Sequence, residues 1–230
     1  DLNAGGTLHS GYEEVYLVSS EGPEARDARS YIMLSIRAFS QKEASGHGVS
    51  CSSTLDGFDP AAAGRKAGEI AELAKDPVPG DEGTYDVVFD PLITGSLLGI
   101  YGMMSSAFYV MVQMSVFGNM VGSRVAPEIV TLRDNPAEYS VENRVFDDEG
   151  YPTEGKAIIE KGVLKTHLHN TSTAKLFGTE TTGNAGLVVP QAWSLELDPG
   201  DMGRDEMFSE VGRGLYLTNT WYTRFQNYAA

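Results

Sequence analysis

Residues 91–123 read PLITGSLLGIYGMMSSAFYVMVQMSVFGNMVGS and contain no Asp, Glu, Lys or Arg. The large apolar residues of this segment recur at spacings of three, four and seven, as on one face of an α-helix, and other apolar residues occupy the remaining faces. A helix that is apolar on most sides belongs in a protein interior or in a bilayer. We therefore expect one central helix that the rest of the chain surrounds.

A membrane span is the alternative interpretation of this segment, because about 20 apolar residues suffice to cross a bilayer. Several features favour a buried helix in a soluble protein instead. The segment contains Gln113 and Asn119, its glycines weaken a lone helix, and no basic cluster marks a cytoplasmic flank. Gly95 and Gly99 form a GxxxG pair, which suits a close helix contact in a membrane or in a soluble core.

The composition limits the classes of partner. The chain has 230 residues, of which 41% are hydrophobic, and this excludes wholesale disorder. The 32 acidic and 17 basic residues give a formal net charge of −15, so we expect no direct binding to nucleic acid or to an anionic membrane. Cys51 is the only cysteine and forms no intrachain disulfide. We expect a cytoplasmic protein.

Both ends of the sequence suggest a longer protein. The first residue is not Met, no signal peptide precedes it, and the last residues directly follow a patterned run. We expect the chain to be truncated at both ends.

The remaining sequence predicts mostly strands. Residues 41–59 are rich in Gly, Ser and polar residues and predict a loop. Asp59 and Pro60 are typical of a helix N-terminus and predict a helix over 60–75, followed by a linker at 76–84. We predict strands at 12–18, 31–39, 85–89, 129–132, 156–159, 163–168 and 214–218, and short helices at 172–177 and 205–212. The residues alone therefore predict an α+β protein of unknown activity.

Two histidines could bind a metal. His167 and His169 lie two apart on a predicted strand, so both side chains face the same side. A metal site needs a third or fourth ligand, which the sequence does not place. A polar strand face is the favoured interpretation, and a metal-dependent hydrolase that uses this pair is the alternative.

An acidic triple is the second candidate for chemistry. Asp147, Asp148 and Glu149 stand next to one another, and neighbouring carboxylates can perform acid–base chemistry or bind a hard cation. Turn residues follow at once and the spacing of a calcium loop is absent, so a solvated turn is favoured.

The third candidate is the segment TTGNAG at residues 181–186, which includes Thr182, Gly183 and Asn184. Its turn could expose backbone amides to a carboxylate or to a peptide backbone, and no nucleotide-binding glycine motif is present. An aromatic edge near the C-terminus could form an interface, a groove or part of the core; it consists of Tyr216, Trp221, Tyr222 and Phe225.

Taken together, several segments resemble the TldD/PmbA family of zinc peptidases, also described as modulators of DNA gyrase. The matching segments are YDVVFDPLITGSLLG, FDDEGYPTEGKAIIEKGVLKTHLHNTSTAKLFG, TTGNAG and GRGLYLTN. Their order covers most of the chain, from about residue 15 to residue 219. The resemblance implies an α+β fold in which residues 1–78 are the tail of an N-terminal α/β domain. Residues 79–230 would form a β-rich C-terminal domain with one buried central helix.

The TldD branch of the family carries HExxxH on this central helix, where two His hold zinc and the Glu polarises the attacking water. Alignment of GSLLGIYGMM with that motif puts Gly99 and Ile100 at the first His and the Glu, and Met104 at the second His. None of these three side chains can perform the corresponding role. The chain therefore resembles the PmbA (TldE) branch, for which we expect no catalytic residue, no metal ligand and no cofactor in this chain.

That branch is thought to pair with a TldD-type subunit, and the resulting heterodimer degrades short or unfolded peptides. The resemblance implies a non-catalytic subunit, with zinc in the TldD-type partner, or a homodimer where no such partner exists. A peptide could add as a strand to an exposed sheet edge. The residues expected to form such an edge are Thr182, Gly183, Asn184, Gly214, Tyr216 and Asn219.

Overall fold

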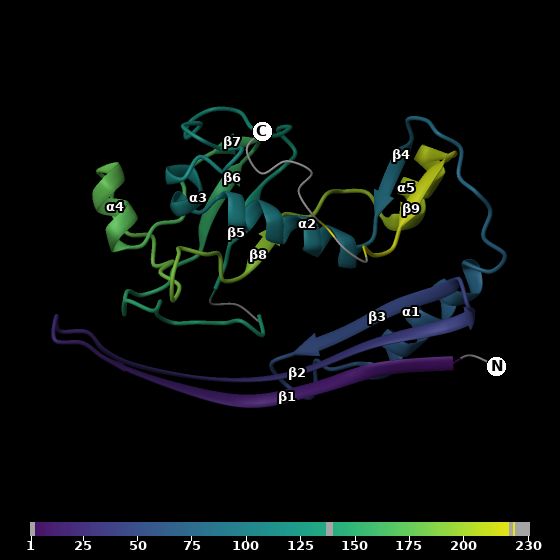
Figure 1. Cartoon of the computed structure of the whole chain (residues 1–230), viewed down its shortest axis with the longest axis horizontal. Coiled ribbons are helices and arrows are strands. Elements are labelled where there is room, and N and C mark those ends of the chain that lie inside the picture. Colours follow the sequence, from purple (N-terminus) through teal and green to yellow (C-terminus); the bar gives the residue numbers. More distant parts are fainter. Residues whose placement is uncertain (1–2, 137–139, 221–222, 224–230) are drawn as a thin grey trace. The chain divides into compact units, whose positions relative to one another are not determined.

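The structure is a computed structural model of the chain, and it describes residues 3–136, 140–220 and 223 (Figure 1). The chain forms two compact units. Of the described residues, the first unit contains 3–12, 30–96, 201–220 and 223, and the second contains 13–29, 97–136 and 140–200. The α+β class predicted from the sequence is confirmed, with more strand than helix. The domain boundary at residue 78 stays a prediction.

A three-stranded sheet with one helix packed on it makes up most of the first unit, except that the end of its first strand and the start of its second, within residues 13–29, belong to the second unit. The strand order is β1 (Asn3–Val18), β2 (Glu24–Gln41) and β3 (Ala44–Ser52), and β2 pairs with β3 in antiparallel fashion. The loop predicted at 41–59 is therefore wrong over its first half, which is β3. Helix α1 (Pro60–Leu73) packs against this strand.

Small residues on the facing surfaces of β3 and α1 explain why the two elements pack so closely. They also explain why the sequence predicts a loop where β3 lies. Alternate residues of β3 face α1, and a Cβ added at Gly46 or Gly48 would overlap the carbonyl oxygen of Ala67 or Ala63 in that helix. The glycines therefore mark a close approach of a helix to a strand and not a loop. The predicted start of α1 is confirmed, because the Asp59 side chain accepts a hydrogen bond from a backbone amide of its first turn.

The rest of the first unit contains a pair of parallel strands. Both strands were predicted from the sequence: β4 (Asp86–Phe89) and β9 (Gly214–Leu217), which pair with each other. Helix α5 (Arg204–Val211) lies beside β4. Gly214 permits this pairing, because a Cβ there would overlap the carbonyl oxygen of Asp86.

The second unit contains an antiparallel sheet in the order β7-β6-β5-β8. The strands are β5 (Leu132–Asp134), β6 (Lys156–Glu160), β7 (Val163–Leu164) and β8 (Leu195–Leu197). The strands predicted at 156–159 and 163–168 are β6 and β7, which pair as an antiparallel hairpin, although β7 ends at residue 164. The turn between them contains Lys161 and Gly162, both with positive φ. Helix α4 (Thr171–Phe177) follows, as predicted, with Asn170 as its N-cap.

The uncharged segment forms two helices instead of one. Helix α2 (Pro91–Met104) ends before two buried serines, Ser105 and Ser106, and the short α3 (Ala107–Met111) follows. The predicted central helix is thus confirmed over residues 91–104, but it is shorter than the uncharged segment and only partly buried. Within the described part of the chain, no helix is long and apolar enough to cross a bilayer.

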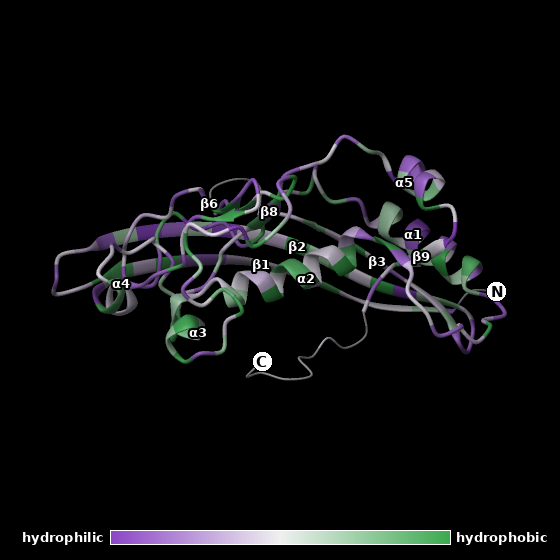
Figure 2. Ribbon diagram, turned by 90° about the horizontal axis from the view of Figure 1, so that it is seen from above, coloured by the Kyte–Doolittle hydropathy of each residue, from purple (hydrophilic) through white to green (hydrophobic). Residues whose placement is uncertain are grey.

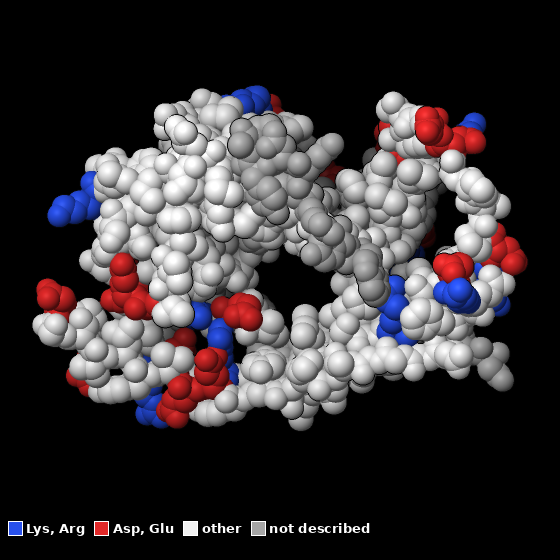
Figure 3. Space-filling model, in the orientation of Figure 1, with Lys and Arg blue, Asp and Glu red and all other residues white. Residues whose placement is uncertain are grey.

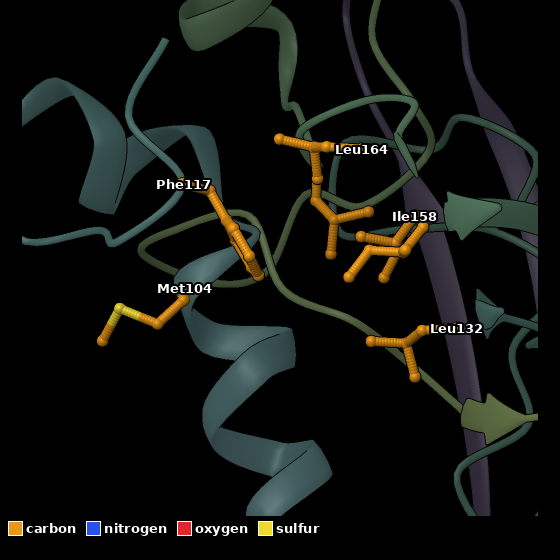
Figure 4. Close-up of a cluster of buried hydrophobic side chains, with 7 residues drawn as sticks. Met104, Phe117, Leu132, Ile158 and Leu164 are labelled. Atoms are coloured by element: carbon orange, nitrogen blue, oxygen red, sulfur yellow. The ribbon is translucent and has the colours of Figure 1, made fainter. Parts of the chain in front are cut away.

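The core of the second unit joins the C-terminal end of α2 to the antiparallel sheet. Figure 4 shows Met104 on α2 in the same cluster as Phe117 and three residues of the sheet. The buried members are Met104, Phe117, Leu132, Ile158, Ile159, Leu164 and Leu168. Helix α2 is therefore fixed on the sheet through its last turns.

Candidate functional site

A buried carboxylate fixes the start of α2. Asp90 is 2% exposed, and its carboxylate accepts hydrogen bonds from Lys66 of α1 (2.8 Å), from the hydroxyl of Tyr216 and from the Leu92 amide (3.1 Å). Burial raises the pKa of Asp90, but the hydrogen bonds outweigh burial, so the net pKa lies below its ordinary value. Asp90 thus joins α1, α2 and β9 as a charged group.

The three residues at the HExxxH positions all lie on α2 and have different surroundings. Gly99 is exposed, and a Cβ added there would meet no atom within 4 Å. Ile100 packs against the core of the second unit, and Met104 belongs to that core with 4% exposure. No carboxylate or imidazole is present at these positions, and a thioether is a poor ligand for zinc, so the residues do not fit a zinc ion.

His167 and His169 are buried, each 4% exposed, with ring centroids 6.4 Å apart. The polar strand face predicted for them is therefore wrong, because β7 ends at residue 164 and the imidazoles are enclosed. The Nε2 of His167 donates to the carbonyl oxygen of Gly118 at 2.9 Å, and Nδ1 of His169 lies 3.3 Å from the hydroxyl of Thr173.

The pKa values of both histidines are lowered. Burial lowers the pKa of His167, and burial together with the neighbouring His167 lowers the pKa of His169 to about 4. Both imidazoles are thus neutral at pH 7. Among residues 3–136, 140–220 and 223, no group of three or more His, Cys, Asp or Glu side chains is placed to hold one metal ion.

The acidic triple lies at the turn that the sequence predicts, with Asp148 exposed, but Asp147 is not solvated. Asp147 is fully buried and accepts hydrogen bonds from three backbone amides, those of Glu149, Tyr151 and Ala185. Burial raises the pKa of Asp147 although these amides favour its charged form. The Glu149 carboxylate accepts from the amide and hydroxyl of Thr171 at the start of α4. These carboxylates organise loops.

The segment 181–186 is held by buried hydrogen bonds. The side-chain amide of Asn184 donates to Asp134 (2.6 Å) and to the Gln191 carbonyl oxygen (2.8 Å), and its oxygen accepts from the hydroxyl of Thr182 (2.8 Å). The carbonyl oxygen of Gly183 accepts from the Trp193 indole at 2.9 Å. Asn184 is fully buried, so the predicted role of this segment in peptide binding depends on its backbone and on Thr182.

Sequence reasoning missed Asp134 and Trp193 as the centre of this network. Asp134 is fully buried and accepts from the backbone amides of Trp193 and Ser194, each at 2.9 Å. The signal was an Asp at the end of a strand, directly before Asn135 and Pro136, where a carboxylate can accept amides of another loop.

The other predicted edge lies in the first unit. Gly214 and Tyr216 are in β9, whose one strand neighbour among the described residues is β4, and Asn219 follows in irregular structure. The Tyr216 ring contacts Phe208 of α5 at 5.0 Å between centroids, and burial with the bond to Asp90 raises its pKa to about 12. The structure does not bring this edge and residues 182–184 into one compact unit. Trp221, Tyr222 and Phe225 lie outside the described residues.

Two family models match the chain. Residues 82–230 match the model of the PmbA/TldA metallopeptidase C-terminal domain, and residues 3–75 match that of the central domain.

Curated relatives and solved structures agree with this match. A metalloprotease of Methanothermobacter thermautotrophicus is 29% identical over 67% of this chain and 35% of its own length. A TldD homologue of Buchnera aphidicola subsp. Schizaphis graminum is 27% identical over 92% of this chain and 48% of its own length. The chain thus spans about a third to a half of these relatives.

A structure from Thermotoga maritima, described as a proposed modulator of a DNA gyrase, is 27% identical with a TM-score of 0.87; the match covers 92% of this chain and 50% of that one. The TldE structure from Thermococcus kodakarensis has the same fold, with a TM-score of 0.84 at 22% identity, over 95% of this chain and 52% of that one. The resemblance seen in the sequence is confirmed: the chain belongs to the PmbA/TldA metallopeptidase family, also written TldD/PmbA, and spans its central domain and part or all of its C-terminal domain.

Proposed function

We propose that the protein is a PmbA/TldE-like subunit of a cytoplasmic TldD/TldE-type metallopeptidase complex that degrades short or unfolded peptides. In this proposal a TldD-type partner holds the zinc, and the present chain contributes partner binding and peptide binding. A homodimer is the alternative assembly.

The observation that carries the proposal is the absence of metal-binding side chains at three positions of α2. The family's metal motif maps to Gly99, Ile100 and Met104, which lack any nitrogen or oxygen ligand in their side chains. Ile100 and Met104 also pack in or against the core of the second unit, so they contribute to stability at positions where the resemblance places the Glu and the second His of the TldD motif. Family membership with such a helix supports a subunit that acts through binding.

Peptide binding by strand addition fits two features of the described chain. Strand β9 is an edge strand of the two-stranded sheet β4-β9 in the described structure. The turn 181–186 is held by hydrogen bonds to the buried residues Asp134 and Trp193. A fixed turn or edge loses little conformational entropy when a peptide pairs with it, which favours sequence-tolerant binding.

Co-purification tests the proposal. The full-length protein is co-expressed with the TldD-type protein of the same genome, with an affinity tag on one subunit only. We expect a stable complex that contains zinc on elemental analysis and cleaves an unstructured peptide faster than the TldD-type subunit alone.

Two results would contradict the proposal. One is the absence of a complex together with peptide cleavage that does not change when the full-length protein is added. The other is stoichiometric zinc in the full-length protein purified alone, since that would require a metal site in this subunit.

A further inference from the structure

A pocket of about 290 Å³ opens beside the last turns of α2 in the second unit. Helix α2 contributes Gly99, Gly102 and Met103, α3 contributes Tyr109, and the opposite wall is the segment 189–195. An engineered apolar cavity of about 150 Å³ in another protein holds a benzene molecule. The pocket is therefore large enough for one large side chain.

The absence of a side chain at Gly99 keeps this pocket open. One turn later, Gly102 is packed so closely that an added Cβ would clash with Leu195. At Gly99 an added Cβ would meet no atom within 4 Å. The residue that replaces the first His of the family motif thus exposes the backbone of α2 to the pocket.

The chemistry of the pocket favours an apolar occupant. None of the described residues that line it is charged, although the chain has a net charge of −15. Figure 2 colours α3 green for apolar residues, and the surface over α3 is white in Figure 3, without acidic or basic atoms. An unpaired charge enclosed here would lose hydration without compensation.

Exposed apolar residues continue this surface outside the pocket. Leu187 and Val188 are 92% and 82% exposed in the turn directly before the segment 189–195. The amide of Gly186 donates to the carbonyl oxygen of Val189, which closes this turn. A chain-like ligand that inserts one residue into the pocket could therefore also contact these apolar side chains.

We infer that this pocket binds one large apolar side chain, aromatic or aliphatic, of a peptide substrate. The inference rests on the proposed function, because that function supplies peptides as ligands. It adds a specificity pocket at Gly99 that selects apolar residues and rejects acidic ones. The volume of about 290 Å³ accommodates a single large side chain.

The test uses the full-length protein in complex with its partner subunit, with EDTA present to prevent cleavage. The probes are dye-labelled ten-residue peptides of Gly, Ser and Ala with one central Phe, or with Asp at that position, and fluorescence anisotropy measures binding. Gly99→Leu fills the pocket. Gly95→Leu is the matched control, because Gly95 is exposed one turn earlier in α2, has equally open space and does not line the pocket.

We expect the Phe peptide to bind at least tenfold more tightly than the Asp peptide. Burial of one large apolar side chain corresponds to about a ten- to hundredfold change in affinity. Gly99→Leu should therefore weaken binding of the Phe peptide about tenfold and abolish the preference, and Gly95→Leu should change neither. Both variants should melt at or above the temperature of the parent protein, because both replace an exposed helical glycine.

The outcomes separate the pocket from the function. Equal affinity of the Gly99→Leu and parent complexes for the Phe peptide overturns the pocket and leaves the proposed function intact. Loss of the complex in Gly99→Leu alone would show that the partner subunit occupies the pocket, and this also overturns the inference. No binding of either peptide to the parent complex contradicts both.

A second measurement does not depend on the folding of a variant. A peptide with benzoylphenylalanine at its centre is photo-crosslinked to the parent complex, and mass spectrometry locates the attachment. Attachment within residues 99–109 or 189–195 supports the inference. Attachment only at other sites overturns it.

Discussion

Buried ionisable residues in this chain serve structure through specific hydrogen bonds. Asp134 and Asp147 are fully buried, and backbone amides of distant loops donate to both of them. The carboxylate of Asp90 accepts hydrogen bonds from a lysine, a tyrosine and one backbone amide. A buried carboxylate is tolerated only with such partners, and removal of the partners leaves an expensive uncompensated charge. At the scale of the residue, these acids therefore mark connections between loops.

His169 gives a pH dependence with a definite sign. In the unfolded chain it titrates near pH 6.5, and burial with the neighbouring His167 lowers its pKa to about 4 in the folded chain. As the pH falls from 7 to 5, the unfolded chain takes up a proton that the folded chain excludes. The stability that His169 contributes above pH 6.5 is thus lost towards pH 4, by about 1–2 kcal/mol between pH 7 and 5.

Urea denaturation of the full-length protein at pH 7 and pH 5 measures this effect. The side chain at position 169 cannot titrate in the variant His169→Asn. The fall in its free energy of unfolding between pH 7 and pH 5 should therefore be about 1–2 kcal/mol smaller than the fall in the parent protein. His9→Asn makes the same change at an exposed position of β1 and should behave like the parent protein. An identical pH dependence in His169→Asn and parent would show that His169 is not excluded from protonation.

At the scale of elements, the contact between α1 and β3 depends on the absence of side chains. A Cβ at Gly48 would overlap the carbonyl oxygen of Ala63, and backbone atoms cannot move aside as a flexible side chain can. Gly48→Ala should therefore lower the free energy of unfolding by about 1–3 kcal/mol or more, as other overpacking substitutions do.

Gly64→Ala is the matched control for this prediction, because Gly64 lies in α1 and an added Cβ there meets nothing within 4 Å. It should raise the free energy of unfolding by about 1 kcal/mol through helix propensity. Urea denaturation of both variants gives the comparison. If Gly48→Ala were as stable as the parent protein, α1 would not approach β3 as closely as the structure describes.

Regular elements were predictable from the sequence where local signals and packing agree. Asp59 before Pro60 predicted the start of α1, and two apolar runs around residues 160–162 predicted β6 and the strand that follows. Strand β3 was missed because its glycines are locally typical of a loop. Glycine is needed there because α1, 15 or more residues away in sequence, approaches the strand closely. The uncharged segment was assigned one helix because composition does not indicate where Ser105 and Ser106 interrupt it.

The candidate site was likewise predictable where local sequence signals suffice and not where distant residues meet. The family motif located Gly99, Ile100 and Met104 on a helix, and the structure adds which of them pack in or against the core and which lies beside a pocket. The network around Asp134 and Asn184 joins residues 50 positions apart through buried hydrogen bonds. No local pattern specifies such a pairing, because it depends on how loops of different strands meet.

At the scale of the whole molecule, the charge balance predicts a response to salt. The chain carries 32 acidic and 17 basic residues, so repulsion among its acidic groups acts over the whole surface. Salt weakens this repulsion, since the Debye length falls from about 30 Å at 0.01 M to about 3 Å at 1 M. Salt also weakens exposed ion pairs such as Arg26–Glu14 and Arg133–Asp198.

The excess of acidic over basic residues decides which of these two effects dominates. Each basic residue can offset one acidic residue locally, which leaves a net charge of −15. The acidic residues that are not offset repel one another. The free energy of unfolding of a protein made of these 230 residues should therefore rise by about 1 kcal/mol or more between 0.02 and 0.5 M NaCl at pH 7. Urea denaturation in NaCl and in KCl measures the change, and agreement between the two salts separates screening from binding of one cation. A fall in stability with added salt would instead show that local ion pairs outweigh the overall repulsion, and the acidic surface would then be a source of stability.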